Sequence, residues 1–236
     1  MDDYVARAIA YAKGAIKDKK RLSHGVLIRQ ASTRFIEDLK RAKRKNRTFI
    51  FDEWHANDVC DFIEKLPHVE GVWAKPTIEL HDSQVFFLVQ LFGFRKTESK
   101  NLIGYGEFRP RRFTTALFAI ARKNAKSTMS AAVLLYCQTC EPEVGGQVIS
   151  AATTFSQAGI IFNIAKAMVD KTQDLRDAFG LECWAKSISR VETGSSFKPV
   201  HSKASTQDGL NPSHVGLDEI HAHKSGDLLN VLQSAA

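Results

Sequence analysis

The chain has 236 residues, of which 44% are hydrophobic and 25% charged, and its formal net charge is +7. These proportions are typical of a globular protein with one large core or two small ones. The sequence has no run of about 18 apolar residues, which excludes a bilayer-spanning helix. Its acidic beginning is unlike a signal peptide. We therefore expect a cytoplasmic protein whose basic charge favours a polyanionic partner.

The first 46 residues are predicted to form a basic helical appendage. One apolar helix face is marked, at spacings of three and four, by Ile28, Ala31, Phe35 and Leu39. Residues 40–47 then place six cations in eight positions, and a second basic group comprises Arg109, Arg111 and Arg112. Such groups bind DNA or RNA phosphates by releasing counterions, although a solvated helix face explains the first group equally well.

Residues 47–236 are predicted to form an α/β domain. The segment RTFIFD reads as a short strand, and a helix beginning near Asp52 is marked by Ala56, Val59, Phe62, Ile63 and Leu66. Buried strands are expected at 113–121, 146–153 and 213–220, and helices at 126–140 and 155–170. This alternation indicates a mostly parallel sheet flanked by helices.

The four cysteines are too few and too scattered for the disulfide framework of a secreted protein. Cys137 and Cys140 form a C-x-x-C, which is half of a common zinc motif. The second cysteine pair or the His-x-x-x-His that completes such a motif is missing from the sequence. We therefore expect these cysteines to pack in or near a core helix.

The stretch FAIARKNAKST, residues 118–128, ends like a phosphate-binding loop but has Ala125 where such loops carry glycine. It lies between a predicted strand and a predicted helix, where backbone N–H groups and the helix dipole favour a phosphate. Lys126 would supply a cation for the β and γ phosphates, and Ser127 a magnesium ligand. A solvated helix start is the alternative explanation of the lysines.

Two adjacent carboxylates, Asp218 and Glu219, follow the predicted strand at 213–220. One can hold magnesium through water while the other orients an attacking water, although an acidic helix cap is the competing explanation for either residue alone. Ligands of open α/β sheets bind at the carboxyl ends of the strands. The acidic pair and the loop at Lys126 are therefore expected to face one crevice.

In this order the motifs resemble the ATPase part of the large terminase subunit of tailed bacteriophages, a DNA-packaging motor. Residues 121–127, ARKNAKS, resemble the family's phosphate loop A-R-K-N-G-K-S. Residues 80–94 resemble the segment in which a glutamine, here Gln84, contacts adenine, although alone Gln84 reads as an ordinary polar residue near a helix start. The resemblance extends from about residue 48 to the end of the sequence.

The resemblance implies a P-loop NTPase fold, ATP and Mg²⁺ as cofactors, and specific residue roles. Glu219 would be the catalytic base, Arg122 would reach the γ phosphate, and Ser127 with Asp218 would serve the metal. The nucleotide-binding set would comprise Gln84, Arg122, Lys123, Asn124, Ala125, Lys126, Ser127 and Thr128. A glycine-only torsion at Ala125 would cost roughly 1 to 2 kcal/mol and slow turnover, whereas an α-like torsion would tolerate alanine.

The resemblance also implies partners: double-stranded DNA, a portal protein, a small terminase subunit and further copies in a ring, in the host cytoplasm during phage assembly and away from any membrane. Family members continue into a nuclease domain, so the ATPase domain is expected to be incomplete at its C-terminus and nuclease activity is not expected from this chain alone. The alternatives are a helicase-like nucleic-acid-dependent NTPase and a catalytically impaired nucleotide- or DNA-binding module.

Overall fold

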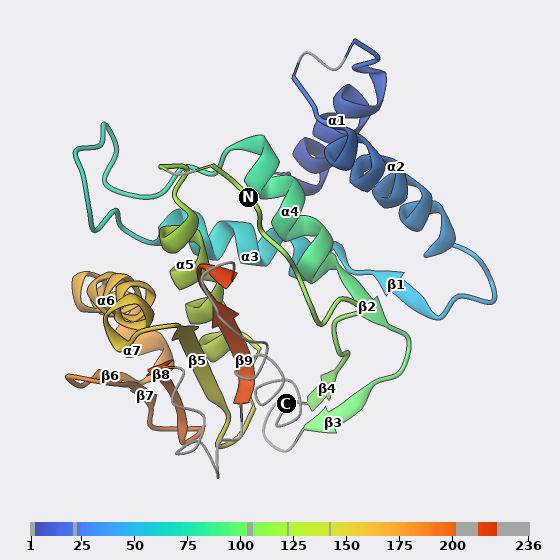
Figure 1. Cartoon of the computed structure of the whole chain (residues 1–236). Helices are drawn as coiled ribbons and strands as arrows, with labels where there is room; N and C mark the ends of the chain where they lie inside the picture. Colours follow the sequence, from blue (N-terminus) through green and yellow to red (C-terminus); the bar gives the residue numbers. More distant parts are fainter. Residues whose placement is uncertain are drawn as a thin grey trace. The chain divides into compact units, whose positions relative to one another are not determined.

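A computed structural model describes residues 3–20, 23–102, 106–121, 123–141, 143–201 and 212–220. The chain is a mixed α/β protein that divides into two compact units (Figure 1). The first unit comprises residues 1–65 and 79–118, and the second comprises residues 66–78 and 119–236. Among the described residues, none of the helices is both long enough and apolar enough to cross a membrane.

Four helices make up most of the first unit: α1 (Tyr4–Lys17), α2 (Val26–Arg41), α3 (Glu53–Lys65) and α4 (Asp82–Gly93). Two short antiparallel pairs join β1 (Phe49–Phe51) to β2 (Phe94–Lys96) and β3 (Lys100–Leu102) to β4 (Gly106–Phe108). The ring of Phe35 lies 5.5 to 6.2 Å from the rings of Phe51, Phe86 and Phe94, which form an aromatic core. The predicted strand RTFIFD and the helix after Asp52 are confirmed.

A buried carboxylate beside this core pairs with one arginine from each of the two predicted basic groups. Asp38 is 1% exposed and pairs through its two oxygens with Arg41 at 3.0 Å and Arg112 at 2.7 Å. The guanidinium of Arg112 also lies 3.8 Å from the ring centroid of Phe49. Arg109 pairs with Glu107 at 2.8 Å. Arg112, which the sequence singled out for its charge, therefore contributes to internal packing.

Replacing Asp38 with asparagine is expected to lower the free energy of unfolding by about 2–4 kcal/mol. The change leaves the half-buried Arg112 without its anionic partner, and removing one member of a buried pair costs more than the pair contributes. Urea unfolding followed by far-UV circular dichroism measures the effect. Glu37→Gln, on the exposed neighbour, is the matched control, and equal stability of the two variants would contradict the role of Asp38.

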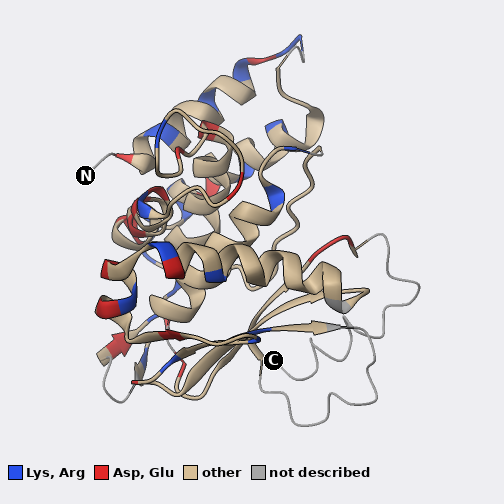
Figure 2. Ribbon diagram, turned by 90° about the vertical axis from the view of Figure 1, so that its left-hand side faces the viewer, with Lys and Arg blue, Asp and Glu red and all other residues tan. Residues whose placement is uncertain are grey.

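The second unit contains a five-stranded sheet in the order β6-β7-β8-β5-β9. Its strands are β5 (Gln147–Ala152), β6 (Leu181–Cys183), β7 (Ile188–Arg190), β8 (Ser195–His201) and β9 (Pro212–Leu217). β5 pairs in parallel with both β8 and β9, whereas β6, β7 and β8 pair antiparallel. The expected parallel strands are thus present, and an antiparallel edge extends them. β5 and β9 contain no lysine, arginine, aspartate or glutamate, and most of the sheet is tan in Figure 2.

Three helices accompany this sheet: α5 (Lys126–Thr139), α6 (Phe155–Lys171) and α7 (Gln173–Phe179). α5 contacts α6 and β9, and α6 covers β5 and β8. At Gly216 the strand β9 approaches α5 so closely that a Cβ atom would lie 2.7 Å from Cδ1 of Leu134. The helices predicted at 126–140 and 155–170 and the strands at 146–153 and 213–220 are confirmed, with β9 ending one residue before Asp218.

The strand predicted at residues 113–121 is wrong. None of these residues belongs to a strand, and most of their side chains are exposed. A strand needs a neighbour for its backbone hydrogen bonds, and the described sheet ends at β9 without pairing to this segment. The aromatic residues at its ends pack locally instead, Phe113 against Phe94 and Phe118 against Phe87.

Candidate nucleotide site

The lysine at the start of α5 contacts both carboxylates that follow β9. Nζ of Lys126 lies 2.7 Å from Oε1 of Glu219 and 3.3 Å from Oδ1 of Asp218. The hydrogen bond with Glu219 is the largest cause that raises the pKa of Lys126, with Asp218 contributing further. The structure therefore brings together the cation and the two anions that the sequence placed in one crevice, although they are 92 and 93 positions apart in the chain.

The acidic pair has a defined backbone geometry at the carboxyl end of β9. The N–H of Asp218 donates to the carbonyl oxygen of Ala151 at 3.0 Å, which extends the pairing of β9 with β5 by one residue. Oδ1 of Asp218 accepts the N–H of Glu219 at 2.9 Å. Glu219 itself has a φ of 49°, in the left-handed region. The turn therefore directs two consecutive carboxylates out of the end of one strand.

Two described residues of the loop before α5 are left-handed, and neither of them is glycine. Lys123 has a φ of 64°, and Ala125, the N-cap of α5, has φ 57° and ψ 27°. Each such torsion costs about 1 kcal/mol or more for a residue with a Cβ atom. Nδ2 of Asn124 donates to the carbonyl of Ala121 at 3.2 Å and closes the turn. Ala125 thus adopts the glycine-like torsion on which the sequence argument depended, not the α-like one.

The N-terminus of α5 has the character of an anion site. No side chain caps it, and its first turn has no acidic residue. The N–H groups of a helix's first turn and the helix dipole favour a negative charge there. Ser127 and Thr128 are the second and third residues of this helix, and both are half-buried. Arg122, predicted to reach the γ phosphate, lies outside the described residues.

Gln84 belongs to the first unit and is occupied in a helix cap. Its Oε1 accepts the backbone N–H of His81 at 2.8 Å, while Nδ1 of His81 accepts the N–H of Ser83 at 3.3 Å. This reciprocal arrangement closes the first turn of α4. The position of Gln84 near a helix start is confirmed, and its contact with adenine stays a prediction.

Two threonines at the carboxyl end of β5, Thr153 and Thr154, were not singled out from the sequence. Oγ1 of Thr153 lies 2.5 Å from Oε1 of Gln157, and Oγ1 of Thr154 caps α6 by accepting the N–H of Gln157. These residues follow the strand whose Ala151 carbonyl is bound by Asp218. Their signal in the sequence is two threonines directly after an apolar strand, at the edge where ligands of such sheets bind.

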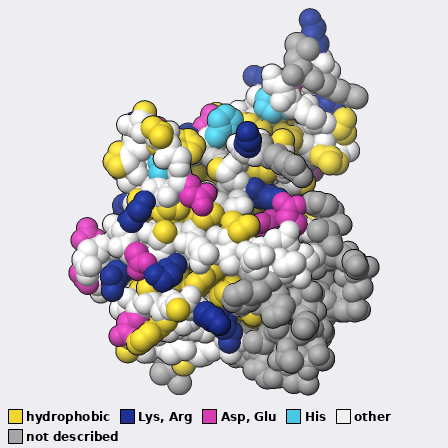
Figure 3. Space-filling view, turned by 60° about the vertical axis from the view of Figure 1, so that its left-hand side comes forward, with side chains coloured by type: hydrophobic (Ala, Val, Ile, Leu, Met, Phe, Trp, Pro, Cys, Tyr) yellow, Lys and Arg dark blue, Asp and Glu magenta, His cyan; other side chains and the backbone are white. Residues whose placement is uncertain are grey.

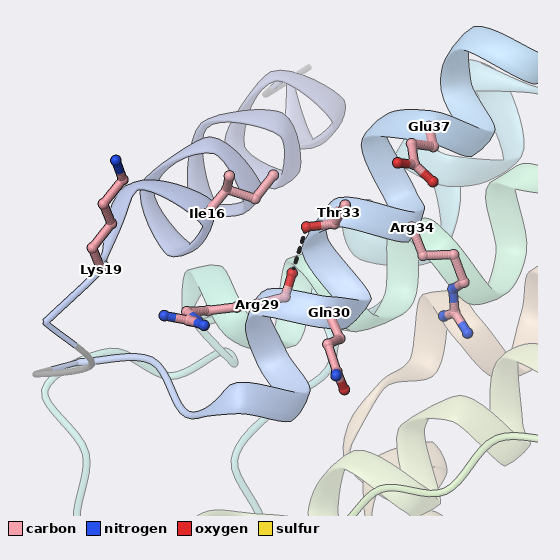
Figure 4. Close-up of a pocket in the computed structure, with 7 residues that line it drawn as sticks. All are labelled: Ile16, Lys19, Arg29, Gln30, Thr33, Arg34 and Glu37. Carbon is pink, nitrogen blue, oxygen red and sulfur yellow. Dashed lines mark hydrogen bonds between the residues drawn. The ribbon is translucent and has the colours of Figure 1, made fainter.

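The first unit has a shallow cavity of about 400 Å³ between α1 and α2 (Figure 4). Its lining includes the charged residues Lys19, Arg29, Arg34 and Glu37. Oγ1 of Thr33 donates to the carbonyl of Arg29 at 2.9 Å. Arg29 in turn donates to the carbonyl of Asp18. The cavity holds none of the residues predicted to bind nucleotide. On the face drawn in Figure 3, basic side chains are interspersed with acidic and apolar ones.

Comparisons with known proteins agree on one family. The family model described as "Terminase large subunit, ATPase domain" matches residues 83–235, which is more than half of the chain. The large terminase subunit of Enterobacteria phage HK97 is 31% identical over 106 residues, covering 44% of this chain and 21% of that protein. The crystal structure of the HK97 large terminase matches with a TM-score of 0.60 at 23% identity, over 76% of this chain and 34% of that one. The chain therefore spans about a third or less of the length of these relatives.

Proposed function

Because the chain belongs to the family of terminase large-subunit ATPase domains, we propose that it hydrolyses ATP to drive double-stranded DNA into a procapsid. The fold proposed for residues 47–236 is that of a P-loop NTPase, preceded by the helical appendage at 1–46. The proposed partners are DNA, a portal protein, a small terminase subunit and further copies of the chain in a ring, in the cytoplasm of the host. DNA cleavage is not proposed for these residues.

The observation that carries this proposal is the contact of Lys126 with Asp218 and Glu219. ATP hydrolysis needs cations for the phosphates, oxygen ligands for Mg²⁺ and a group that orients water. The donor set fits Mg²⁺–ATP, because Mg²⁺ prefers oxygen ligands and the mostly buried carboxylate of Asp218 with the hydroxyl of Ser127 supplies them. The uncapped start of α5 favours the phosphates. When bound, Mg²⁺ would neutralise charge that develops on the phosphate oxygens.

The proposed roles are those that the resemblance to the family implies, and the contact of Lys126 with the acidic pair supports three of them. Lys126 binds the β and γ phosphates, and the backbone of residues 122–128 surrounds them. Glu219, the catalytic base, orients the attacking water, and Arg122 stabilises charge on the γ phosphate. Gln84 contacts adenine, and Asp218 with Ser127 holds the metal. Phosphoryl transfer is accelerated mostly by this kind of positioning and charge stabilisation, which the protein's own groups supply.

A phosphate-release assay with and without double-stranded DNA tests the function. We expect release that depends on Mg²⁺ and increases when DNA is present. Nucleotide binding without any release would instead support an impaired nucleotide- or DNA-binding module, to which the left-handed alanine in the loop gives a physical basis. The helicase-like alternative is not favoured, given the family to which the chain belongs.

Replacing Ala125 with glycine is expected to raise ATP affinity or turnover by up to about fivefold. Glycine adopts the left-handed torsion without the cost of about 1 kcal/mol that alanine bears. Without this cost, the loop closes on phosphate more readily. The Kd for ATP and the steady-state kcat measure the effect. Ala119→Gly, at an exposed position outside the loop, is the control, and unchanged kinetics of Ala125→Gly would show that the methyl group is harmless.

A further inference from the structure

A second cluster of metal-binding side chains lies in the same unit. Cys137 in the last turn of α5, Glu141 just after that helix and His214 in β9 each offer one ligand atom, and these atoms lie within 4.8 Å of one another. Cys137 and Glu141 are 3% and 5% exposed, and the side chain of His214 is 14% exposed. The cluster is therefore a buried meeting point of three segments and not a group of surface acids.

The cluster joins two elements that pack side by side. α5 contacts β9 (Figure 1), and the close approach at Gly216 holds them together between the two ends. The nucleotide residues Lys126 and Asp218 lie at one end of this pair. Cys137 lies eleven residues further along α5, about 17 Å away at 1.5 Å per residue. The cluster is thus separate from the proposed Mg²⁺ position.

The separation of the imidazole and the carboxylate suits a small tetrahedral ion. Nε2 of His214 lies 3.6 Å from Oε2 of Glu141, which is longer than a hydrogen bond. Zinc bonds of about 2.0–2.2 Å to nitrogen and oxygen place tetrahedral neighbours about 3.4 Å apart. Buried carboxylates are stabilised by a paired charge or by a metal. The observed separation therefore needs only a small adjustment to admit an ion between the imidazole and the carboxylate.

We propose that Cys137, Glu141 and His214 bind Zn²⁺, with a water as the fourth ligand. The combination of a thiolate, an imidazole and a carboxylate is typical of zinc, whereas Mg²⁺ and Ca²⁺ take oxygen ligands. The ion ties the C-terminal end of α5 to the beginning of β9. It acts structurally, by fixing the relative position of the two elements whose other ends carry the lysine and the acidic pair. Without the ion, the imidazole and the carboxylate lie 3.6 Å apart beside a thiol.

The C-x-x-C motif supplies a matched control for this proposal. Cys140, three residues after Cys137, lies beside Oγ1 of Thr139 at 3.4 Å and is outside the cluster. A sequence-based zinc motif would use both cysteines, whereas the structure uses one of them together with residues 4 and 77 positions further along the chain. Cys137→Ser and Cys140→Ser therefore distinguish the two arrangements.

The test is titration of the metal-free full chain with Co²⁺, followed by displacement with Zn²⁺. The wild-type chain and Cys140→Ser are expected to bind one equivalent of Co²⁺ and to show a thiolate-to-cobalt charge-transfer band. Cys137→Ser is expected to lose this band. Removing even an outer partner of a metal ligand weakens binding by about 10–100-fold, so His214→Gln is expected to weaken Zn²⁺ binding by about 100-fold or more.

Thermal unfolding provides a readout that is independent of ATP hydrolysis. Zn²⁺ is expected to raise the Tm of the wild-type chain and of Cys140→Ser, because an ion that binds only the folded state stabilises it, and to leave the Tm of His214→Gln unchanged. Far-UV circular dichroism establishes that each variant is folded. Failure of the wild-type chain to bind Co²⁺ or Zn²⁺, or equal binding by a folded Cys137→Ser or His214→Gln variant, overturns the proposal.

Discussion

Replacing Glu219 with glutamine is expected to lower ATP turnover by about 10²–10⁴-fold while ATP binding persists. Glutamine has nearly the same shape but cannot accept a proton from water, and general bases contribute rate factors of this size. Phosphate release measured under single-turnover conditions reports the chemical step, and binding of a fluorescent ATP analogue reports occupancy. The glutamine also loses the charge that Lys126 pairs with, so ATP affinity is expected to stay equal or to increase.

The control for this prediction is Glu182→Gln, on the exposed face of the edge strand β6. It removes the same charge from the same unit at a position distant from the sheet edge that carries Asp218. Turnover of this variant is expected to match the wild type. Wild-type turnover in Glu219→Gln would remove Glu219 from the mechanism, whatever the state of the control.

Replacing Lys126 with alanine is expected to weaken ATP binding by about 10–100-fold. A hydrogen bond to a charged group contributes about 1.5–3 kcal/mol, and the proposed contacts to phosphate are of this kind. The loss also leaves Asp218 and Glu219 without the cation between them, which adds like-charge repulsion against the incoming phosphates. Isothermal titration calorimetry with a non-hydrolysable ATP analogue and Mg²⁺ measures the Kd.

Lys166→Ala is the matched control for this variant. Lys166 pairs with Asp170 at 2.5 Å, and its side chain is 30% exposed compared with 31% for Lys126. Both lysines also have a pKa raised chiefly by a hydrogen bond to a carboxylate. Each variant therefore removes a lysine that is paired with a carboxylate, and only Lys126 lies at the proposed phosphate position. Equal ATP affinity in both variants would contradict the role of Lys126.

Much of the second unit could be predicted because its patterns are local. The apolar runs that become β5 and β9 and the helices beginning at Lys126 and Phe155 have clear periodicity. The meeting of Lys126 with Asp218 and Glu219 followed from a topological rule about sheet edges. The residues meet even though the strand expected at 113–121 is wrong. Packing of α5 against β9 is enough to bring them together.

The remaining features depend on contacts that no local pattern encodes. An apolar run such as residues 113–121 has the composition of a strand, but only a neighbouring strand can make it one. The meeting of Cys137 with His214 depends on the way β9 packs along α5, and their separation of 77 positions conceals it. The burial of Asp38 beside Arg112 is likewise set by tertiary packing, whereas the sequence marked Arg112 only as part of a basic group.

The contact between Lys126 and Glu219 has a consequence for the proposed ATPase activity when no nucleotide is present. Lys126, proposed to hold the phosphates, donates a hydrogen bond to Glu219, which is proposed to orient water. Before nucleotide binds, the charge of the lysine is therefore directed at the acidic pair. Turnover must begin with an exchange of partners, in which the incoming phosphates take the lysine and thereby set the glutamate free. On this geometry, binding of ATP and release of Glu219 from Lys126 are one event.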